Sequence, residues 1–441
     1  MPLNEILAIA CVLSFFALLA LGIPVALTLA LSGFVFGWLG FGSLLFGLLP
    51  ARIFGVTANY TLIAIPLFVF MGVMLEKSRL ADELMDVIGH ISGSLRGGMG
   101  LGIVLVGVLM GATTGIVGAT IATLGLLTLP TLLRRGYDPS TACGTICASG
   151  TLGQLIPPST ILILLADIMG QSVGTLFAAA VFPGLLLSGV FCVYILVLGM
   201  AKPDLMPPVP YDERQAMPAR DLVLKVLKVG LPPIALVVAV LGSIIGGIAA
   251  PTEAASMGAL GSILVAAVAG RLNWATLRDT VHATARITAA MMFILVCAQV
   301  FALAFRGLQG EKLVHDLFAH VPGGASGVIL FMLGLIFVLG FFIEWIEISY
   351  IVVPMFLPVL SAASVDPVWT AALIAVVLQT SFLTPPFGWA LFYLRGVAPP
   401  QVSTLQIYKG VVPFIILQLI TLGIVFAYPS LATWLPKAIG W

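Results

Sequence analysis

The sequence predicts an all-α polytopic membrane protein built from two inverted repeats that contain re-entrant hairpins and broken helices. Composition, an internal repeat and paired prolines inside apolar segments predict this fold class. Hydrophobic residues make up 61% of the 441-residue chain and charged residues only 8%, whereas a soluble protein carries about 25% charged residues. The net charge of +1 favours no nucleic-acid partner, so the expected surrounding is the lipid bilayer.

Apolar runs at the start of the chain predict membrane spans near residues 4–21, 23–42 and 56–76. The first run lacks the basic start and the small-residue cleavage site of a signal peptide, so a retained span is expected. A polar amphipathic stretch, residues 77–98, follows the third run.

The segment 99–133 is too long and too rich in Gly and Thr for one straight span, and GATTGIVGAT (111–120) interrupts it. Irregular backbone at membrane depth is tolerated only inside protein or beside a water-filled cavity. The segment therefore predicts a re-entrant hairpin with its tip at 111–118.

The next segment, 139–169, contains the adjacent prolines Pro157 and Pro158. Two prolines remove two backbone donors and disfavour the helical conformation before them. A broken helix is therefore expected here, followed by a span near 175–200 that ends the first half.

The second half repeats the first at a nearly constant offset of 228 residues, which is the separation of Pro158 and Pro386. LPTLLRRGYDPSTA (129–142) resembles LPVLSAASVDPVWT (357–370), and LIPPSTILILL resembles LTPPFGWALFY. An almost gapless match of prolines indicates duplication rather than chance matching.

We therefore expect a first repeat at 1–200, a linker at 201–221 and a second repeat at 222–441. Within the second repeat, the offset places a hairpin at 327–361 and a broken helix at 367–397. Each half crosses the membrane an odd number of times, so the second copy is expected to be inverted. Lys and Arg in the linker predict that it is cytoplasmic, with both chain termini on the periplasmic side.

Discontinuous helices at matching positions of inverted repeats are typical of secondary transporters. Freed carbonyls of unwound backbone can coordinate a small cation, while half-helix N-termini can face an anion. SGTLGQLIPPS and QTSFLTPPFG are therefore predicted to form two symmetry-related sites. A hairpin tip completes each, GATTG (111–115) in the first half and LGFFIEWIE (339–347) in the second. The alternative is a pair of packing kinks or small-residue helix contacts.

Long motifs in both halves resemble the large, DctM-like membrane subunit of tripartite ATP-independent periplasmic (TRAP) transporters. They include IPLFVFMGVMLEKSRLADEL (65–84), PTEAASMGALG (251–261) and the stretch from GATTGIVGAT to GQLIPPS. The resemblance covers essentially the whole chain. It implies a sodium-driven importer of the bacterial inner membrane, in which a scaffold holds an elevator-type transport part. Its implied partners are a small four-helix membrane subunit and a periplasmic binding protein that delivers an organic anion.

Two further stretches narrow the resemblance. GTICASGTLGQLIPPS and FFIEWIEISYIVVP resemble the mannitol or chloroaromatic type branch of the family, whose members have been linked to 2-oxo acids and lactate. The substrate implied is therefore a carboxylate such as a 2-oxo or 2-hydroxy acid.

The resemblance also implies two sodium sites made largely of backbone oxygens. The first would use Gly111, Thr114, Gly153, Ile156 and Pro158, and the second would use Gly340, Ser381, Thr384 and Phe387. Relatives often have Ser at the first of these positions and Gly at Ser381, and backbone ligation survives such exchanges. We expect the surface between tips and breaks to hold the substrate, reached from Thr113, Ser149, Gln154 and Ser159.

Sodium ions are the only metal, and no cofactor is expected. Cys143 and Cys147 share a helix face, but no His or second Cys pair supports another metal site. Glu344 and Glu347 lie in an apolar run and are functional candidates, because ionisable residues at membrane depth are costly. Pairing with an Arg or an interfacial position is the alternative for both. Arg306 is expected at a membrane edge or in a salt bridge.

Other classes of protein fit the sequence less well. A binding-protein-independent sodium/carboxylate symporter would share the repeats, the hairpins and the elevator, and only the long motifs disfavour it. An intramembrane protease is disfavoured because no His lies at an evident position to pair with Ser149. The chain carries no Walker motif for ATP hydrolysis, so it is not expected to be an enzyme. Matched breaks fit alternating access better than the open pore of a channel.

Overall fold

The chain folds as a bundle of helices. The computed structural model describes residues 2–78, 83, 84, 87, 91, 94–115, 117–209, 219–318, 322–386 and 388–441, and only the backbone of Thr113, Thr114, Ala219, His315, Leu317 and Phe318. These residues form α-helices and 3-10 helices and contain no strand. Nine of the described helices are long and apolar enough to cross a membrane, so the predicted all-α polytopic class is confirmed.

The first half runs through nine α-helices and two 3-10 helices. They are α1 (Leu3–Ala20), α2 (Val25–Phe41), α3 (Leu44–Thr57), η1 (Tyr60–Ile63), α4 (Ala64–Lys77), α6 (Gly98–Thr114), α7 (Val117–Arg134), α8 (Pro139–Thr151), η2 (Leu152–Gln154), α9 (Thr160–Met169) and α10 (Val173–Ala201). Helix α3 fills residues that the predicted spans left unassigned. It is an apolar helix of 14 residues with Pro50 inside it, and it packs on α14 and α2.

The second half follows the described part of the linker. The linker contains η3 (Pro203–Leu205). The elements that follow are α12 (Ala219–Ile245), α13 (Pro251–Val268), α14 (Trp274–Gly307), α15 (Gly310–Phe318), α16 (Gly324–Leu339), α17 (Trp345–Ala362), α18 (Pro367–Leu383), α19 (Trp389–Val397), α20 (Thr404–Ala427) and α21 (Ser430–Ala438). The bounds of α7 and α17 differ by the repeat offset at both ends.

An Asp-Pro pair starts both broken helices. Asp138 accepts a hydrogen bond from the Thr141 amide at 2.8 Å and precedes α8. Asp366 accepts from the Val368 amide at 2.9 Å and precedes α18. A side-chain acceptor at the N-cap followed by Pro at the first helical position is a favoured helix start. The same local signal therefore sets the register of both broken helices.

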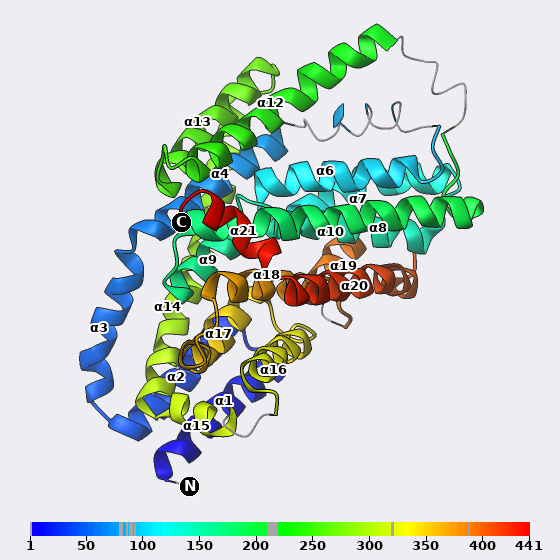
Figure 1. The fold of residues 1–441 in the computed structure, drawn as a ribbon. Coiled ribbons are helices and arrows are strands. Elements are labelled where there is room, and N and C mark those ends of the chain that lie inside the picture. Colours follow the sequence, from blue (N-terminus) through cyan, green and yellow to red (C-terminus); the bar gives the residue numbers. More distant parts are fainter. Residues whose placement is uncertain are drawn as a thin grey trace.

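The packing of the two halves follows a two-fold pattern. Helix α2 packs on α14, and its counterpart α13 packs on α4. Helix α8 likewise packs on α20 while α18 packs on α10, and α7 packs on α19 while α17 packs on α9. In Figure 1, α8 and α10 of the first half (cyan to green) lie alongside α18 and α20 of the second half (orange to red). Each of these helices thus contacts a partner from the other repeat.

The two broken helices lie at the centre of this packing. Every residue from Ala142 to Thr151 in α8 is buried, as is every residue from Thr370 to Leu383 in α18. One hydrophobic cluster joins both halves around them. Polar side chains in this core need internal hydrogen-bond partners, because leaving a polar atom unpaired away from water is costly.

Candidate functional site

Both helix interruptions fall at the paired prolines. Helix α8 and the turn η2 end at Gln154, and α9 begins at Thr160. Helix α18 ends at Leu383, and α19 begins at Trp389. The Pro157–Pro158 and Pro385–Pro386 peptide bonds are both cis. The proline nitrogens carry no hydrogen, so these backbone stretches have fewer donors than carbonyl acceptors.

The tip of the first hairpin touches the first break through backbone alone. Helix α6 ends where Gly115 adopts a left-handed conformation, with φ +58°, which a glycine reaches without steric cost. One turn earlier, Gly111 lies directly against Gly153. A Cβ placed on Gly111 would stand 2.1 Å from the Gly153 Cα atom, and one on Gly153 would stand 2.0 Å from the Gly111 Cα atom. No side chain fits at either position.

The second half repeats this contact, but a serine of the broken helix takes the place of a glycine. A Cβ placed on Gly340, at the end of α16, would stand 2.7 Å from the Ser381 Cβ atom of α18. The structure therefore brings together two pairs of the residues predicted to bind sodium. In each pair, a hairpin tip meets a broken helix.

The other residues predicted for the sodium sites lie around these contacts. The Pro158 carbonyl oxygen would lie 3.9 Å from a Cβ on Gly115, so it faces the first tip. Ile156 lies in the same break and packs against Gly184 of α10. The Thr384 carbonyl accepts from the Gly388 amide at 2.9 Å. Thr114 ends α6, and Phe387 lies outside the described residues.

The side chains predicted to bind substrate are engaged inside the protein. The Gln154 amide donates to the Gly115 carbonyl at 2.9 Å, which ties the first break to the first tip. The Ser159 hydroxyl donates to the Gln154 carbonyl, and the Ser149 hydroxyl donates to the Thr145 carbonyl at 2.6 Å. Ser149, Gln154 and Ser159 are all buried. The side chain of Thr113, the fourth predicted residue, lies outside the described part.

A glutamine from the second half also holds the first break, and the sequence did not reveal it. In the amide orientation that satisfies its neighbours, Gln379 of α18 donates to the Thr151 carbonyl at 2.6 Å and accepts from the Leu155 amide at 3.2 Å. Gln379 is fully buried. Its one signal in the sequence is its position, because the repeat offset makes it the counterpart of Thr151.

The end of α9 is tied to two other elements through Asp167. Its carboxylate accepts from the Asn59 side chain, which caps η1. It also accepts from the Tyr350 hydroxyl of α17 at 3.4 Å. Asp167 therefore joins the first broken helix to the start of α4 and to the second hairpin.

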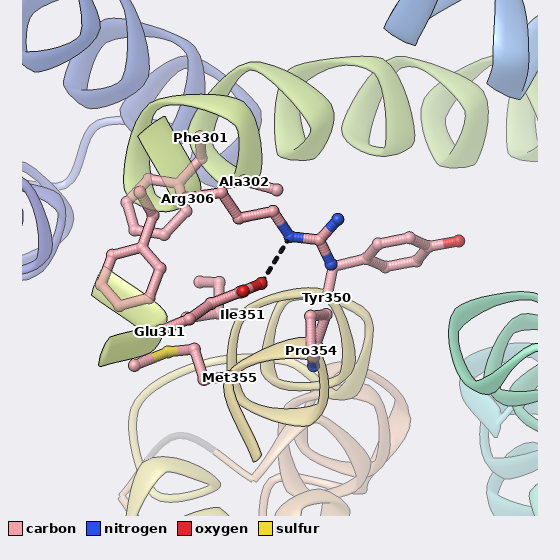
Figure 2. Close-up of a pocket in the computed structure, with 9 residues that line it drawn as sticks. Phe301, Ala302, Arg306, Glu311, Tyr350, Ile351, Pro354 and Met355 are labelled. Atoms are coloured by element: carbon pink, nitrogen blue, oxygen red, sulfur yellow. Dashed lines mark ion pairs between the residues drawn. The ribbon is translucent and has the colours of Figure 1, made fainter. Parts of the chain in front are cut away.

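A pocket lies where α14 and α15 face α17. Figure 2 shows Arg306 and Glu311 side by side in it, with Tyr350 nearby. The Arg306 Nε atom lies 3.0 Å from a Glu311 carboxylate oxygen, and both side chains are partly exposed. The rest of the lining is apolar, from Phe301, Ala302, Phe305, Ile351, Pro354 and Met355. The expected salt bridge of Arg306 is confirmed.

Comparison with known families gives a match over most of the chain. Residues 12–431 match the family model described as tripartite ATP-independent periplasmic transporter, DctM component. The chain is 30% identical over 398 residues to the C4-dicarboxylate TRAP transporter large permease protein DctM of Pseudomonas aeruginosa, covering 89% of this chain and 90% of that protein. It is 27% identical to the ectoine TRAP transporter large permease protein TeaC of Halomonas elongata, covering 96% and 97%.

The fold also resembles a solved transporter. The crystal structure of the YdaH transporter of Alcanivorax borkumensis superposes with a TM-score of 0.62 and 16% sequence identity, covering 91% of this chain and 90% of that chain. At this identity the likeness concerns the fold alone.

Proposed function

Because the chain belongs to the tripartite ATP-independent periplasmic (TRAP) transporters as their large permease subunit, the DctM component, we propose that it imports an organic anion driven by a sodium gradient. Uptake in this family depends on a binding protein, and the large permease works beside a small membrane subunit. The chain is therefore a transport protein and not an enzyme, and family membership disfavours a symporter that needs no binding protein. We place it in the bacterial inner membrane.

The paired contacts between tips and breaks carry the sodium proposal. At each contact, backbone from a hairpin lies against backbone or a small side chain of a broken helix. Proline pairs leave carbonyl oxygens nearby without matching donors, and oxygen is the ligand that hard cations prefer. We assign the first site to Gly111, Thr114, Gly153, Ile156 and Pro158. We assign the second to Gly340, Ser381, Thr384 and Phe387.

For the substrate, we propose a carboxylate such as a 2-oxo or 2-hydroxy acid. Its support is the likeness of two stretches to the mannitol or chloroaromatic type branch, and the printed substrate of the Pseudomonas relative, a C4-dicarboxylate. Thr113, Ser149, Gln154 and Ser159 remain the candidate contacts. Because the last three already make internal hydrogen bonds, a substrate would have to replace a bond rather than meet a free group.

We further propose an elevator in which the two hairpins and broken helices move against a scaffold of α1–α4 and α12–α14. The exchange of partners between α2 and α14, and between α13 and α4, supports a scaffold shared by both repeats. A site built at the meeting of tips and breaks would then travel as one unit.

The proposal is tested by thermal unfolding of the purified chain in sodium and in potassium at equal ionic strength. A ligand that binds only the folded state stabilises it, by about 1.4 kcal/mol when its concentration is tenfold above Kd. We expect sodium to raise the midpoint of the wild type but not of Gly153→Leu or Thr384→Leu. Gly47→Leu is the matched control, because a Cβ there meets nothing within 4 Å.

If sodium and potassium give equal unfolding midpoints for the isolated chain, the measurement is repeated with the small subunit bound. Equal midpoints in that complex would show that sodium does not bind at the breaks.

A further inference from the structure

Two glutamates at the start of α17 take no part in the sodium sites proposed above. Glu344 occupies the N-cap position, where its side chain makes no capping bond, and Glu347 lies in the first turn. Residues three apart on a helix share one face, so the two carboxylates are neighbours. Both lie in the second hairpin tip, LGFFIEWIE (339–347).

Glu347 is enclosed in the protein, and one of its two carboxylate oxygens lacks a partner. Its side chain is 2% exposed, and its Oε2 atom has no hydrogen-bond partner among the described residues. The nearby polar groups of the helix are already engaged. The Ser349 hydroxyl donates to the Trp345 carbonyl at 2.7 Å, and the Tyr350 hydroxyl donates to Asp167.

The elements packed on α17 bring no described cation to Glu347. Helix α17 contacts α9, α14, α15, α16 and α18. From α9 comes Asp167, an acceptor for Asn59 and Tyr350. The charged groups near this end of α14 and α15 are Arg306 and Glu311, which pair with each other, and the exposed Lys312 and Asp316. The described parts of α16 and α18 carry no charged side chain, and Tyr393 of α19 is within electrostatic range of Glu344.

A buried carboxylate without a cation is costly, because burial removes the solvation of the charge and a second carboxylate repels it. Binding of a proton removes this cost, and a proton needs only one carboxylate oxygen atom as its site. A sodium ion would instead need several oxygen ligands arranged around it. Two carboxyl groups that share one site commonly hold one proton between them.

We propose that Glu344 and Glu347 together bind one proton at the start of α17, in addition to the sodium ions of the two breaks. The proton lowers the charge of the pair from −2 to −1 while the second hairpin moves, and it leaves when the pair meets water. This site makes the conformational cycle depend on pH as well as on sodium.

Infrared spectroscopy of the full chain in lipid nanodiscs tests the proton directly. A protonated carboxyl and a carboxylate absorb at different frequencies, so a pH titration at constant sodium counts the protonated groups. We expect the wild type to show a protonated carboxyl band at neutral pH that is lost in Glu347→Gln. The control Asp279→Asn changes an exposed carboxylate of α14 and should leave the band unchanged. A band of equal size in wild type and Glu347→Gln would overturn the proposal.

Thermal unfolding across pH gives the second readout. Protonation removes one of the two buried charges. The unfolding midpoint of the wild type should therefore fall as pH rises and the pair loses its proton. Glutamine is neutral at every pH, so Glu347→Gln should flatten this dependence. A variant that keeps the wild-type slope contradicts the proton site.

A third outcome separates a proton from a metal ion. If the wild type shows no protonated carboxyl band and Glu347→Gln loses the sodium-induced shift in midpoint, Glu347 is a sodium ligand and the proton assignment is wrong. Retention of the sodium shift in Glu347→Gln, with loss of the band, supports separate sites. The sodium sites at the breaks are tested independently by the Gly153 and Thr384 variants.

Discussion

The two broken helices share a backbone plan but differ in the side chains that hold it. In the first, Gln154 ties the break to the tip carbonyl of Gly115, and Gln379 reaches in from the other repeat. In the second, the counterpart of Gln154 is the buried Phe382, and Thr384 donates to its own helix at the Thr380 carbonyl. The Asp-Pro start and the proline pair are thus common to both breaks, whereas Gln154 and Gln379 brace the first.

The short helices after the breaks show the same contrast. Asp167 of α9 bonds to Asn59 and Tyr350 on other elements. Its counterpart Arg395, in α19, donates to the carbonyl of Val402 in the loop that follows. Asp167 therefore anchors the first short helix to distant parts of the fold, whereas Arg395 bonds to the loop beside its own helix.

Two other bonds reach the second break and α19 from further away. The Tyr408 hydroxyl donates to the Pro386 carbonyl at 3.4 Å, and the Cys147 thiol donates to the Ala390 carbonyl at 3.7 Å.

Exchanging the small residues at the two contacts should have the largest effect. Gly153→Ser gives the first break the residue of the second, and its Cβ would stand 2.0 Å from backbone. Forced overpacking of this kind costs about 1–3 kcal/mol or more. Ser381→Gly gives the second break the residue of the first, and it should cost less than about 1 kcal/mol. Thermal unfolding with and without sodium compares the two, and we expect only Gly153→Ser to lose the sodium shift.

A rescue pair checks the steric reason. Gly340→Ala places a Cβ 2.7 Å from the Ser381 Cβ atom and 3.0 Å from its Cα atom. It should therefore destabilise alone and recover in part when combined with Ser381→Gly, which removes the closer clash. No such rescue is available to Gly153→Ser, because its clash is with backbone. A Gly153→Ser variant as stable and as sodium-responsive as wild type would show that the first contact is looser than the structure describes.

Local signals explain why the breaks could be predicted from the sequence. Paired prolines interrupt a helix through missing donors, and an Asp-Pro pair starts one through a cap, so both effects depend on neighbours in the chain. The repeat offset then carried each signal to the other half. The same signals predict that the first tip meets the first break, whereas the particular residues Gly111 and Gly153 are implied by the resemblance to the family.

Long-range bonds explain what the sequence could not show. Gln379 and its partner Thr151 belong to different repeats, and nothing local marks the glutamine as a bridge. The residues assigned to substrate binding are predicted from their polar side chains alone. The sequence does not show that Ser149 and Gln154 already donate to carbonyls inside the protein. Helix α3 was missed because it is shorter than a membrane span.

Removing the bridge between repeats should have the next largest effect. Gln379→Leu removes the donor to the Thr151 carbonyl, while the Leu155 amide keeps its bond to the Leu152 carbonyl at 3.0 Å. An unpaired buried group costs about 1–3 kcal/mol. Gln418→Leu is the matched control, since Gln418 is also fully buried but has no hydrogen-bond partner among the described residues. We expect unfolding of the first variant at a lower midpoint and no loss of stability in the second. Equal losses would mean that both residues act through packing alone.

Removing the side-chain hydrogen bonds that anchor α9 and α19 should cause the smallest loss of stability. It should also show most clearly which segments each bond holds in place. Asp167→Ala removes the acceptor of Asn59 and Tyr350, and each hydrogen bond contributes about 0.5–1.5 kcal/mol. Hydrogen exchange should therefore quicken in α9 and at the start of α17, which are far apart in the chain. Arg395→Ala removes a bond to the adjacent loop, so faster exchange should stay within α19 and the residues up to Val402. Exchange that spreads equally far in both variants would contradict the contrast between the long-range bonds of Asp167 and the local bond of Arg395, because local opening follows the bonds that are lost.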